Sequence, residues 1–130
     1  MILDTSAVIA ILRGEPEAQR FSQIVEEDET SRMSVASYVE AGAVMDAARS
    51  PLVSRQLDEF VRIARVVIEP VTVEQGKIAR EAYRDFGLGS GHPARLNFGD
   101  CFVYALAKTT GELLLFKGSD FGRTDVEGAE

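Results

Sequence analysis

Two aspartates follow apolar segments that are typical of buried strands. Asp4 comes directly after residues 1–3, and Asp120 lies four residues beyond Phe116. In an open parallel sheet, ligands collect beyond the carboxyl ends of the strands. We therefore expect both aspartates on the same rim of a sheet.

Two further acids can face this rim from helices. Asp100 lies near the start of a helix predicted from Phe98, and Glu40 lies in the first turns of a helix that follows the second predicted strand. Carboxylates without partners repel one another and raise one another's pKa, so such a cluster is tolerable mainly around a hard cation. The sequence therefore predicts a Mg²⁺ site, with Mn²⁺ as a substitute.

A magnesium site of this kind could hydrolyse a phosphodiester. Mg²⁺ keeps several waters, so one or two direct carboxylates are enough while the others hold waters. A bound metal lowers the pKa of a water ligand and shields phosphate oxygens, which removes the need for a histidine base. We therefore predict metal-dependent cleavage of a nucleic-acid backbone.

Each acid also has a structural interpretation, which stays open. Asp4 could be only an N-cap, and Asp100 could only complement a helix dipole. Glu40 could be a solvated helix residue or join Ser37 in a capping box. Asp120 could belong to an ordinary Gly-Ser-Asp turn. Only the joint placement of the four favours a catalytic site.

The elements that must position these acids alternate between strands and helices. Apolar runs predict strands at residues 1–3, 32–35, 66–71 and 113–116. Helical spacing predicts helices at residues 7–12, from Pro16 onward, and at 36–48, 51–64, 73–86 and 98–108. Thr5 or Ser6 can cap the first helix. This alternation predicts an α/β fold around a mainly parallel sheet.

Composition predicts one cytoplasmic domain over residues 1–130. The chain is 45% hydrophobic, which suffices for a core, and only residues 127–130 read as a polar tail. The single Cys101 cannot form an internal disulfide, and it is expected as a packed thiol. No basic leader precedes the first apolar run, and no apolar run approaches membrane-spanning length.

The net charge of −7 argues against a generic polyanion partner. This objection weakens if several acids converge on a divalent cation, because the occupied site then becomes cationic. The positions of the acids therefore decide whether nucleic acid can bind.

Four segments, in order, resemble the VapC-like toxins of the PIN-domain family over essentially the whole chain. They are ILDTSA, SYVEA around Glu40, LNFGDCFVYALAK and LLFKGSDFGRTD. The resemblance implies a PIN-like three-layer α/β/α sandwich. It also implies a magnesium-dependent endoribonuclease that is the toxin of a type II toxin–antitoxin pair. The implied partners are RNA, a small separate antitoxin and a second copy of the chain.

The resemblance also assigns roles to residues. Asp4 and Asp100 would be the principal metal ligands, and Glu40 and Asp120 would complete the acidic site. Ser6 would be a supporting hydroxyl near the metal or phosphate. The resemblance leaves open whether Asp125 approaches the pocket or is a surface acid in a turn.

Several basic and aromatic residues could contact RNA. His92, the only histidine, lies with Arg95 in a glycine-bearing loop before Asp100, where both could hold phosphates or simply be exposed. A phosphate track or solvated helix faces would equally explain a further set, namely Arg13, Lys77, Arg80, Arg84 and Lys117. The phenylalanines and tyrosines fit a core better than a base-stacking platform.

Three other functions fit less well. A response-regulator receiver needs adjacent acids after its first strand, whereas Thr5 follows Asp4. It also needs a phosphoacceptor aspartate after its third strand, whereas residues 66–68 are followed by Glu69 and Pro70. A haloacid-dehalogenase-type phosphatase needs a second aspartate at the position of Ser6. A non-catalytic PIN-like binding domain stays open, although no expected acidic position is missing.

Overall fold

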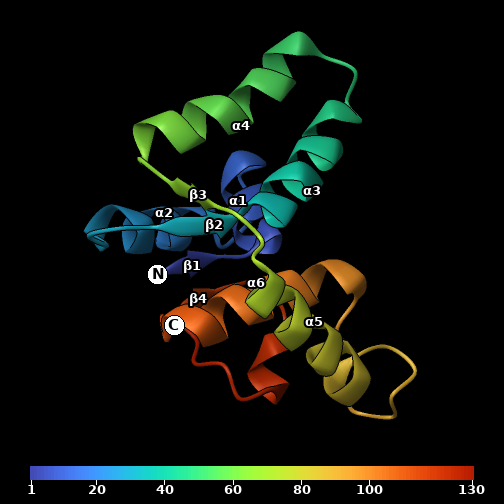
Figure 1. Cartoon of the computed structure of the whole chain (residues 1–130). Coiled ribbons are helices and arrows are strands. Elements are labelled where there is room, and N and C mark those ends of the chain that lie inside the picture. The colour runs from blue at the N-terminus through green and yellow to red at the C-terminus, as the bar shows by residue number, and fades with distance from the viewer.

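A computed structural model describes all 130 residues, in which strands and helices alternate along the chain (Figure 1). The strands are β1 (Ile2–Leu3), β2 (Arg32–Ser34), β3 (Val67–Glu69) and β4 (Leu114–Leu115). The helices are α1 (Thr5–Leu12), α2 (Ala18–Glu27), α3 (Val35–Asp46), α4 (Pro51–Ile63), α5 (Val73–Phe86), α6 (Phe98–Thr110) and the short 3-10 helix η1 (Phe121–Arg123). The predicted α/β class is confirmed.

The four strands form one sheet in the order β3-β2-β1-β4. Every neighbouring pair is parallel, with Ile2 opposite Arg32 on one side and Leu114 on the other. All strands therefore end at one edge of the sheet, and the segments that follow β1 and β4 leave from that edge. This topology places Asp4 and the chain leading to Asp120 on one side of the molecule.

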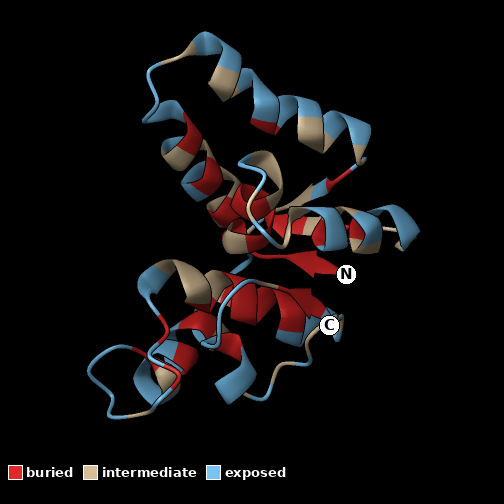
Figure 2. Cartoon of the chain, turned by 180° about the vertical axis from the view of Figure 1, so that it is seen from behind, coloured by how far each residue is buried: buried red, intermediate tan, exposed pale blue.

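Helices cover both faces of the sheet, as the three-layer prediction requires. Ile2 and Leu114 pack into a core with α5 and α6, whereas the next residues, Leu3 and Leu115, pack with α1 to α4. Successive strand residues point to opposite faces, so each short strand contributes to both cores. Figure 2 shows the buried residues gathered around the sheet, with the exposed residues on the outer helix faces and loops.

The caps of two helices decide between the predicted alternatives. The interpretation of Asp4 as an N-cap is confirmed, because its Oδ2 accepts a hydrogen bond from the Ser6 backbone N–H at 3.0 Å, whereas the alternative caps Thr5 and Ser6 lie inside α1. Ser34 caps α3, so β2 ends one residue earlier than predicted. Ser37 is buried inside α3. The predicted capping box between Ser37 and Glu40 is therefore wrong.

Other predicted boundaries shift by one to three residues. Helix α2 begins at Ala18 rather than at Pro16, α3 ends at Asp46, and α6 runs on to Thr110 before Gly111 ends it with a φ of 70°. The shorter β3 ends at Glu69 because the following Pro70 has no backbone N–H to donate. Helix α5 has the predicted bounds at both ends.

The last four residues are not a free polar tail, contrary to the prediction. The backbone N–H of Leu114 donates to the Glu127 carbonyl at 2.9 Å, and the Ala129 N–H donates to the Leu114 carbonyl at 2.9 Å. Ala129 also packs against the core on the α1 side of the sheet. The segment thus pairs with the open edge of β4, which leaves fewer backbone groups unpaired there.

Candidate active site

Asp4 is the most buried acid of the candidate site. It lies between β1 and α1 and is 5% exposed. Its Oδ2 accepts hydrogen bonds from both the backbone N–H and the hydroxyl of Ser6. Burial raises the pKa of Asp4, the hydrogen bonds from Ser6 oppose this shift, and the charge of Glu40 adds to it. A buried carboxylate with a raised pKa is typical of a functional position.

Ser6 links the Asp4 carboxylate to the end of β4. Its hydroxyl donates to Asp4 and accepts a hydrogen bond from the Lys117 backbone N–H at 2.9 Å. The Asp4 backbone N–H in turn donates to the Leu115 carbonyl at 3.0 Å. The Asp4 side chain is therefore held between α1 and the strand that leads toward Asp120.

Asp100 is fixed by a capping box at the start of α6. Its backbone N–H donates to Asn97 Oδ1 at 2.8 Å, and its own Oδ2 accepts from the Asn97 N–H at 2.9 Å. The interpretation of Asp100 as an acid at the start of a helix is thus correct. The capping box uses only Oδ2, so the other carboxylate oxygen, Oδ1, can still contribute to the candidate site.

The pKa of Asp100 responds to the three other predicted acids. It is raised to about 6, chiefly by burial; the hydrogen bond from the Asn97 N–H opposes this shift, and the charges of Asp4, Asp120 and Glu40 add to it. Such charges act mainly over short distances in a partly buried site. One electrostatic unit is therefore formed by four acids from different segments, namely Asp4 after β1, Glu40 on α3, Asp100 on α6 and Asp120 after β4.

Glu40 reaches this unit because α6 has a glycine in its first turn. The Glu40 carboxylate lies against Gly99, and a Cβ atom at position 99 would overlap Glu40 Oε2. Glu40 itself is exposed to solvent. The contact brings α3 against the start of α6 and sets the Glu40 carboxylate beside the residue that precedes Asp100.

Asp120 is exposed and begins η1 without making a side-chain capping bond. Gly118, two residues earlier, has a φ of 102°, a conformation that favours glycine and turns the chain after β4. The turn interpretation of this segment is therefore correct. Asp120 nevertheless lies close enough to act on the pKa of Asp100.

The four acids have no basic partner within the chain. None of the ion pairs of the structure involves Asp4, Glu40, Asp100 or Asp120. No group of three or more carboxylate, thiol or imidazole side chains lies close enough together to surround a metal ion as it stands. The acids thus form an open rim of uncompensated oxygen donors, a donor set that fits a hydrated Mg²⁺ better than an enclosed metal cage.

The other predicted contact residues have contacts or exposure of their own. The His92 ring packs edge-on against Phe86 with centroids 4.8 Å apart, and its Nδ1 accepts from the Ala94 N–H at 3.1 Å. Arg95 is exposed. Asp125 accepts hydrogen bonds from the Tyr104 hydroxyl at 2.6 Å and from Lys108 Nζ at 2.9 Å.

Asp125 therefore belongs to a second, charge-balanced group. The hydrogen bond from Tyr104 lowers the pKa of Asp125, and Lys108 lowers it further. Asp125 is also absent from the charges that act on Asp100. Of the two interpretations of this residue, the one outside the pocket is supported.

Sequence reasoning missed three residues beside the acids. Asn97 forms the capping box, Gly99 admits Glu40, and the Phe98 side chain is 74% exposed. The Asn-x-x-Asp spacing could have indicated the cap. The assignment of the phenylalanines to a core is wrong for Phe98. The local pattern does not distinguish it from the buried Phe21, because both have apolar residues three and four positions further along their helices.

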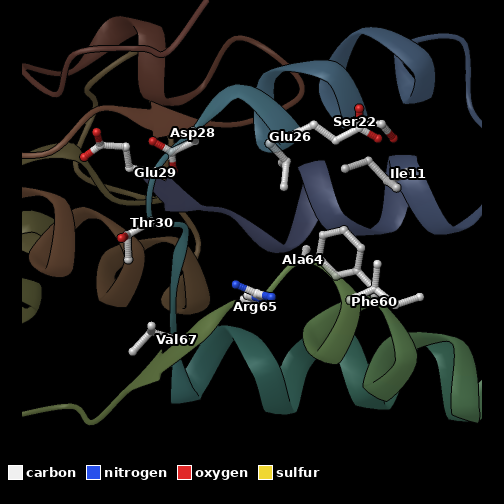
Figure 3. Close-up of a pocket in the computed structure, with 12 residues that line it drawn as sticks. Ile11, Ser22, Glu26, Asp28, Glu29, Thr30, Phe60, Ala64, Arg65 and Val67 are labelled. Carbon is white, nitrogen blue, oxygen red and sulfur yellow. The ribbon is translucent and has the colours of Figure 1, made fainter.

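A large hollow lies away from the acidic rim. It has a volume of about 690 Å³ and lies between α1, α2, α4 and the segments that enter β2 and β3 (Figure 3). Ile11, Val25 and Phe60 contribute apolar surface, and Glu26 and Glu29 contribute acidic surface. The four clustered acids do not line it. It is therefore better suited to a partner than to the predicted chemistry.

Two comparisons agree with this architecture. The family model of the PIN domain matches residues 1–127. A crystal structure of VapC20 from Mycobacterium tuberculosis, a toxin that cleaves the sarcin-ricin loop, aligns with a TM-score of 0.75. That alignment covers 96% of this chain and 95% of VapC20 at 16% identity, which shows likeness of fold. The chain belongs to the PIN-domain family.

Close relatives narrow this assignment. The chain is 54% identical over 129 residues to ribonuclease VapC28 of Mycobacterium tuberculosis, covering 99% of this chain and 97% of the relative. It is 48% identical over 129 residues to ribonuclease VapC42 of the same species, covering 99% and 98%. Within the PIN-domain family the chain is a member of the VapC group, the ribonuclease toxins of type II toxin–antitoxin systems.

No helix has both the length and the apolar composition needed to cross a membrane.

Proposed function

We propose that this chain is a magnesium-dependent endoribonuclease whose site consists of Asp4, Glu40, Asp100 and Asp120. The observation that carries the proposal is the convergence of four carboxylates without a basic partner: the Glu40 carboxylate packs against Gly99 beside Asp100, and the charges of Asp4, Glu40 and Asp120 all act on Asp100. Four carboxylates without a basic partner need a cation to be stable together at neutral pH. The VapC group uses a divalent metal, and the choice of Mg²⁺ with Mn²⁺ as a substitute is part of the proposal.

Asp4 and Asp100 are the proposed direct ligands, because their side chains are already held in place. Ser6 fixes Oδ2 of Asp4, and Asn97 fixes Oδ2 of Asp100. The Oδ1 atoms take part in none of these hydrogen bonds and remain for the metal. Little side-chain entropy is then lost on binding, which favours affinity.

Glu40 and Asp120 are exposed, and their proposed role is to hold water molecules around the metal and to orient the attacking one. A bound divalent cation would lower the pKa of a water molecule and offset the charge of the phosphodiester. The acids themselves contribute position. A carboxylate oxygen that accepts a hydrogen bond from water sets the direction of attack on phosphorus.

The test is cleavage of total cellular RNA by the wild type and by an Asp4→Asn, Asp100→Asn double variant. Each protein is assayed with Mg²⁺, with Mn²⁺ or with excess chelator. We expect discrete products from the wild type with metal, and none from the double variant or with chelator. Asp125→Asn is the matched control, because this aspartate lies in a separate, charge-balanced group. Absence of cleavage by the metal-loaded wild type would favour the non-catalytic PIN-like binding domain.

A cognate antitoxin is the proposed protein partner, and the hollow of Figure 3 is its proposed docking site. The apolar side chains of Ile11, Val25 and Phe60 suit the apolar face of a helix. Glu26 and Glu29 beside them suit basic residues on its rim. The expected partner segment is therefore amphipathic and basic.

This part of the proposal is tested with the co-expressed antitoxin. Ile63 lines the hollow and is 67% exposed, so Ile63→Glu should keep the fold and break the complex. Leu52→Glu is the matched control, since Leu52 is 72% exposed on the same helix and does not line the hollow. Equal complex formation by both variants would place the antitoxin elsewhere.

A homodimer is also proposed. Val35 and Val39, four residues apart on α3, are 38% and 64% exposed, and a second copy would cover such side chains. Light scattering coupled to size exclusion gives the molar mass of the chain without antitoxin. A mass of one chain at micromolar concentration would reject the dimer.

A further inference from the structure

A small groove lies between α5 and α6. Its walls carry the rings of Tyr83 from α5 and of Phe98 and Phe102 from α6, and its volume is about 250 Å³. The two helices lie side by side in Figure 1 and make the most extensive helix contact of the molecule. Sites for drug-sized ligands usually span about 300–1,000 Å³, so this groove suits one planar ring system.

Phe98 is the most exposed aromatic ring of this groove. Its side chain is 74% exposed, and its ring meets the Phe102 ring edge-on, with centroids 5.0 Å apart. Phe102 therefore contacts the Phe98 ring on one side, and most of the surface of Phe98 faces solvent. Phe98 and Asp100 both lie in the first turn of α6, but residues two apart on a helix point to different sides, so the Phe98 ring lies on the α5 side of the helix and Asp100 on another.

Positive charge continues from this groove along α5. A second hollow of about 620 Å³ shares Arg80 and Tyr83 with the groove and is also lined by Lys77 and Arg84. Arg84 pairs with Asp85, whereas Lys77 and Arg80 form no ion pair within the chain. The one acid that lines this hollow is Glu81. In a chain with a net charge of −7, this is a local reversal of sign.

We propose that the groove between α5 and α6 is a nucleobase subsite for single-stranded RNA. An unpaired base of the bound strand stacks on Phe98, and the adjoining phosphates follow Arg80 and Lys77. Exposed aromatic rings flanked by cationic side chains are features that bind single-stranded RNA. Every base has a face that can stack on a ring, and every phosphate of the backbone carries a negative charge. This inference rests on the proposed ribonuclease function and adds the position of the substrate.

Binding is measured apart from cleavage, so that the two proposals can fail separately. The protein is the Asp4→Asn, Asp100→Asn double variant in chelator, and the probe is a fluorescein-labelled single-stranded RNA 12-mer of mixed sequence. Fluorescence anisotropy gives Kd. We expect Phe98→Ala in this background to raise Kd about 5- to 100-fold, the usual effect of losing one stacked base. Phe98→Tyr keeps the ring and should bind like the parent.

Two further comparisons separate stacking from general apolar or electrostatic effects. Phe98→Leu keeps apolar bulk without a π-face, so it should resemble Phe98→Ala. With an abasic 12-mer the parent should bind as weakly as Phe98→Ala, since no base remains to stack. Arg80→Gln should weaken both RNAs and reduce the slope of log Kd against log salt by about 0.7. Leu113→Ala is the control, because Leu113 is exposed before β4, at the opposite edge of the sheet.

Two outcomes would overturn the subsite. The first is an unchanged Kd for Phe98→Ala in a protein that melts like its parent. The second is a change in molar mass of Phe98→Ala without RNA, measured by light scattering, which would make this face a contact between copies. Loss of cleavage in the wild-type background would bear on neither outcome, because binding is measured without metal.

Discussion

The carboxylate of Glu40 on α3 lies directly against Gly99 in the first turn of α6, where any Cβ atom would overlap it. Two helices that are far apart in the sequence thus meet at the only residue type that permits this approach. The contact carries Glu40 to the side of Asp100, whose pKa responds to the Glu40 charge. One glycine therefore decides whether the fourth carboxylate reaches the rim.

We expect Gly99→Ala to lower the rate of RNA cleavage by about 10- to 100-fold, because it displaces Glu40 while leaving every carboxylate in the chain. The melting temperature should change little, since alanine favours a helix and offsets part of the steric cost. Gly42→Ala in α3 is the matched control, because its nearest neighbour, Leu57 Cδ2, would lie at an ordinary 3.8 Å. Equal rates for the two variants would show that Glu40 needs no such contact.

The metal-free chain should lose stability as pH rises from about 4 to about 6. The pKa of Asp100 is raised from 3.8 to about 6, so the folded chain binds this proton more tightly than the unfolded chain. The stabilising effect of protonation is complete below about 4 and gone above about 6. After allowance for partial exposure and screening, we expect roughly 1–2 kcal/mol, measured by urea unfolding in chelator.

Two variants check this assignment. Asp100→Asn should reduce the pH dependence over that window, and the Asp4→Asn, Asp100→Asn double variant should reduce it further, because burial raises the pKa of Asp4 as well. Asp125→Asn should not, because the pKa of Asp125 is lowered by Tyr104 and Lys108, so its contribution is present at neutral pH and is lost only as pH falls below its ordinary range. An unchanged slope in Asp100→Asn would assign the effect to another group.

Divalent metal should raise the melting temperature of the wild type. A ligand that binds only the folded chain adds about 2.7 kcal/mol at a concentration 100 times its Kd. We expect the shift with Mg²⁺ and with Mn²⁺ in differential scanning fluorimetry. The Asp4→Asn, Asp100→Asn double variant should show none, whereas Asp125→Asn should keep it. A flat response of the wild type at millimolar metal would argue against a metal site.

Ser6 should act as a positioning residue for Asp4. Its hydroxyl links the Asp4 carboxylate to the Lys117 backbone N–H, so Ser6→Ala removes both bonds. We expect weaker Mg²⁺ binding by about 5- to 10-fold and a stability loss of about 1 kcal/mol. Ser6→Thr keeps the hydroxyl and should restore the affinity for Mg²⁺. This recovery would show that the hydroxyl positions Asp4 and does more than stabilise the fold.

The order of elements was predictable because it depends on local periodicity. Helix α5 has its predicted bounds, since its apolar residues repeat at helical spacing and glycine ends it. The parallel sheet followed from the alternation of strands with helices. Boundaries shifted where a side chain decided them, as at Ser34, which caps α3 through a hydrogen bond of 3.2 Å to the Ala36 N–H.

The sequence by itself determined which acids exist and that Asp4 follows a buried strand. Only the tertiary structure decided that Glu40 and Asp120 come near Asp100, because a carboxylate is affected by charges that are close in space, wherever they lie in the chain. The same holds for Phe98, whose exposure depends on how α5 packs against α6. Local pattern fixes the type of each residue and its element, whereas packing between distant elements fixes what its side chain can touch.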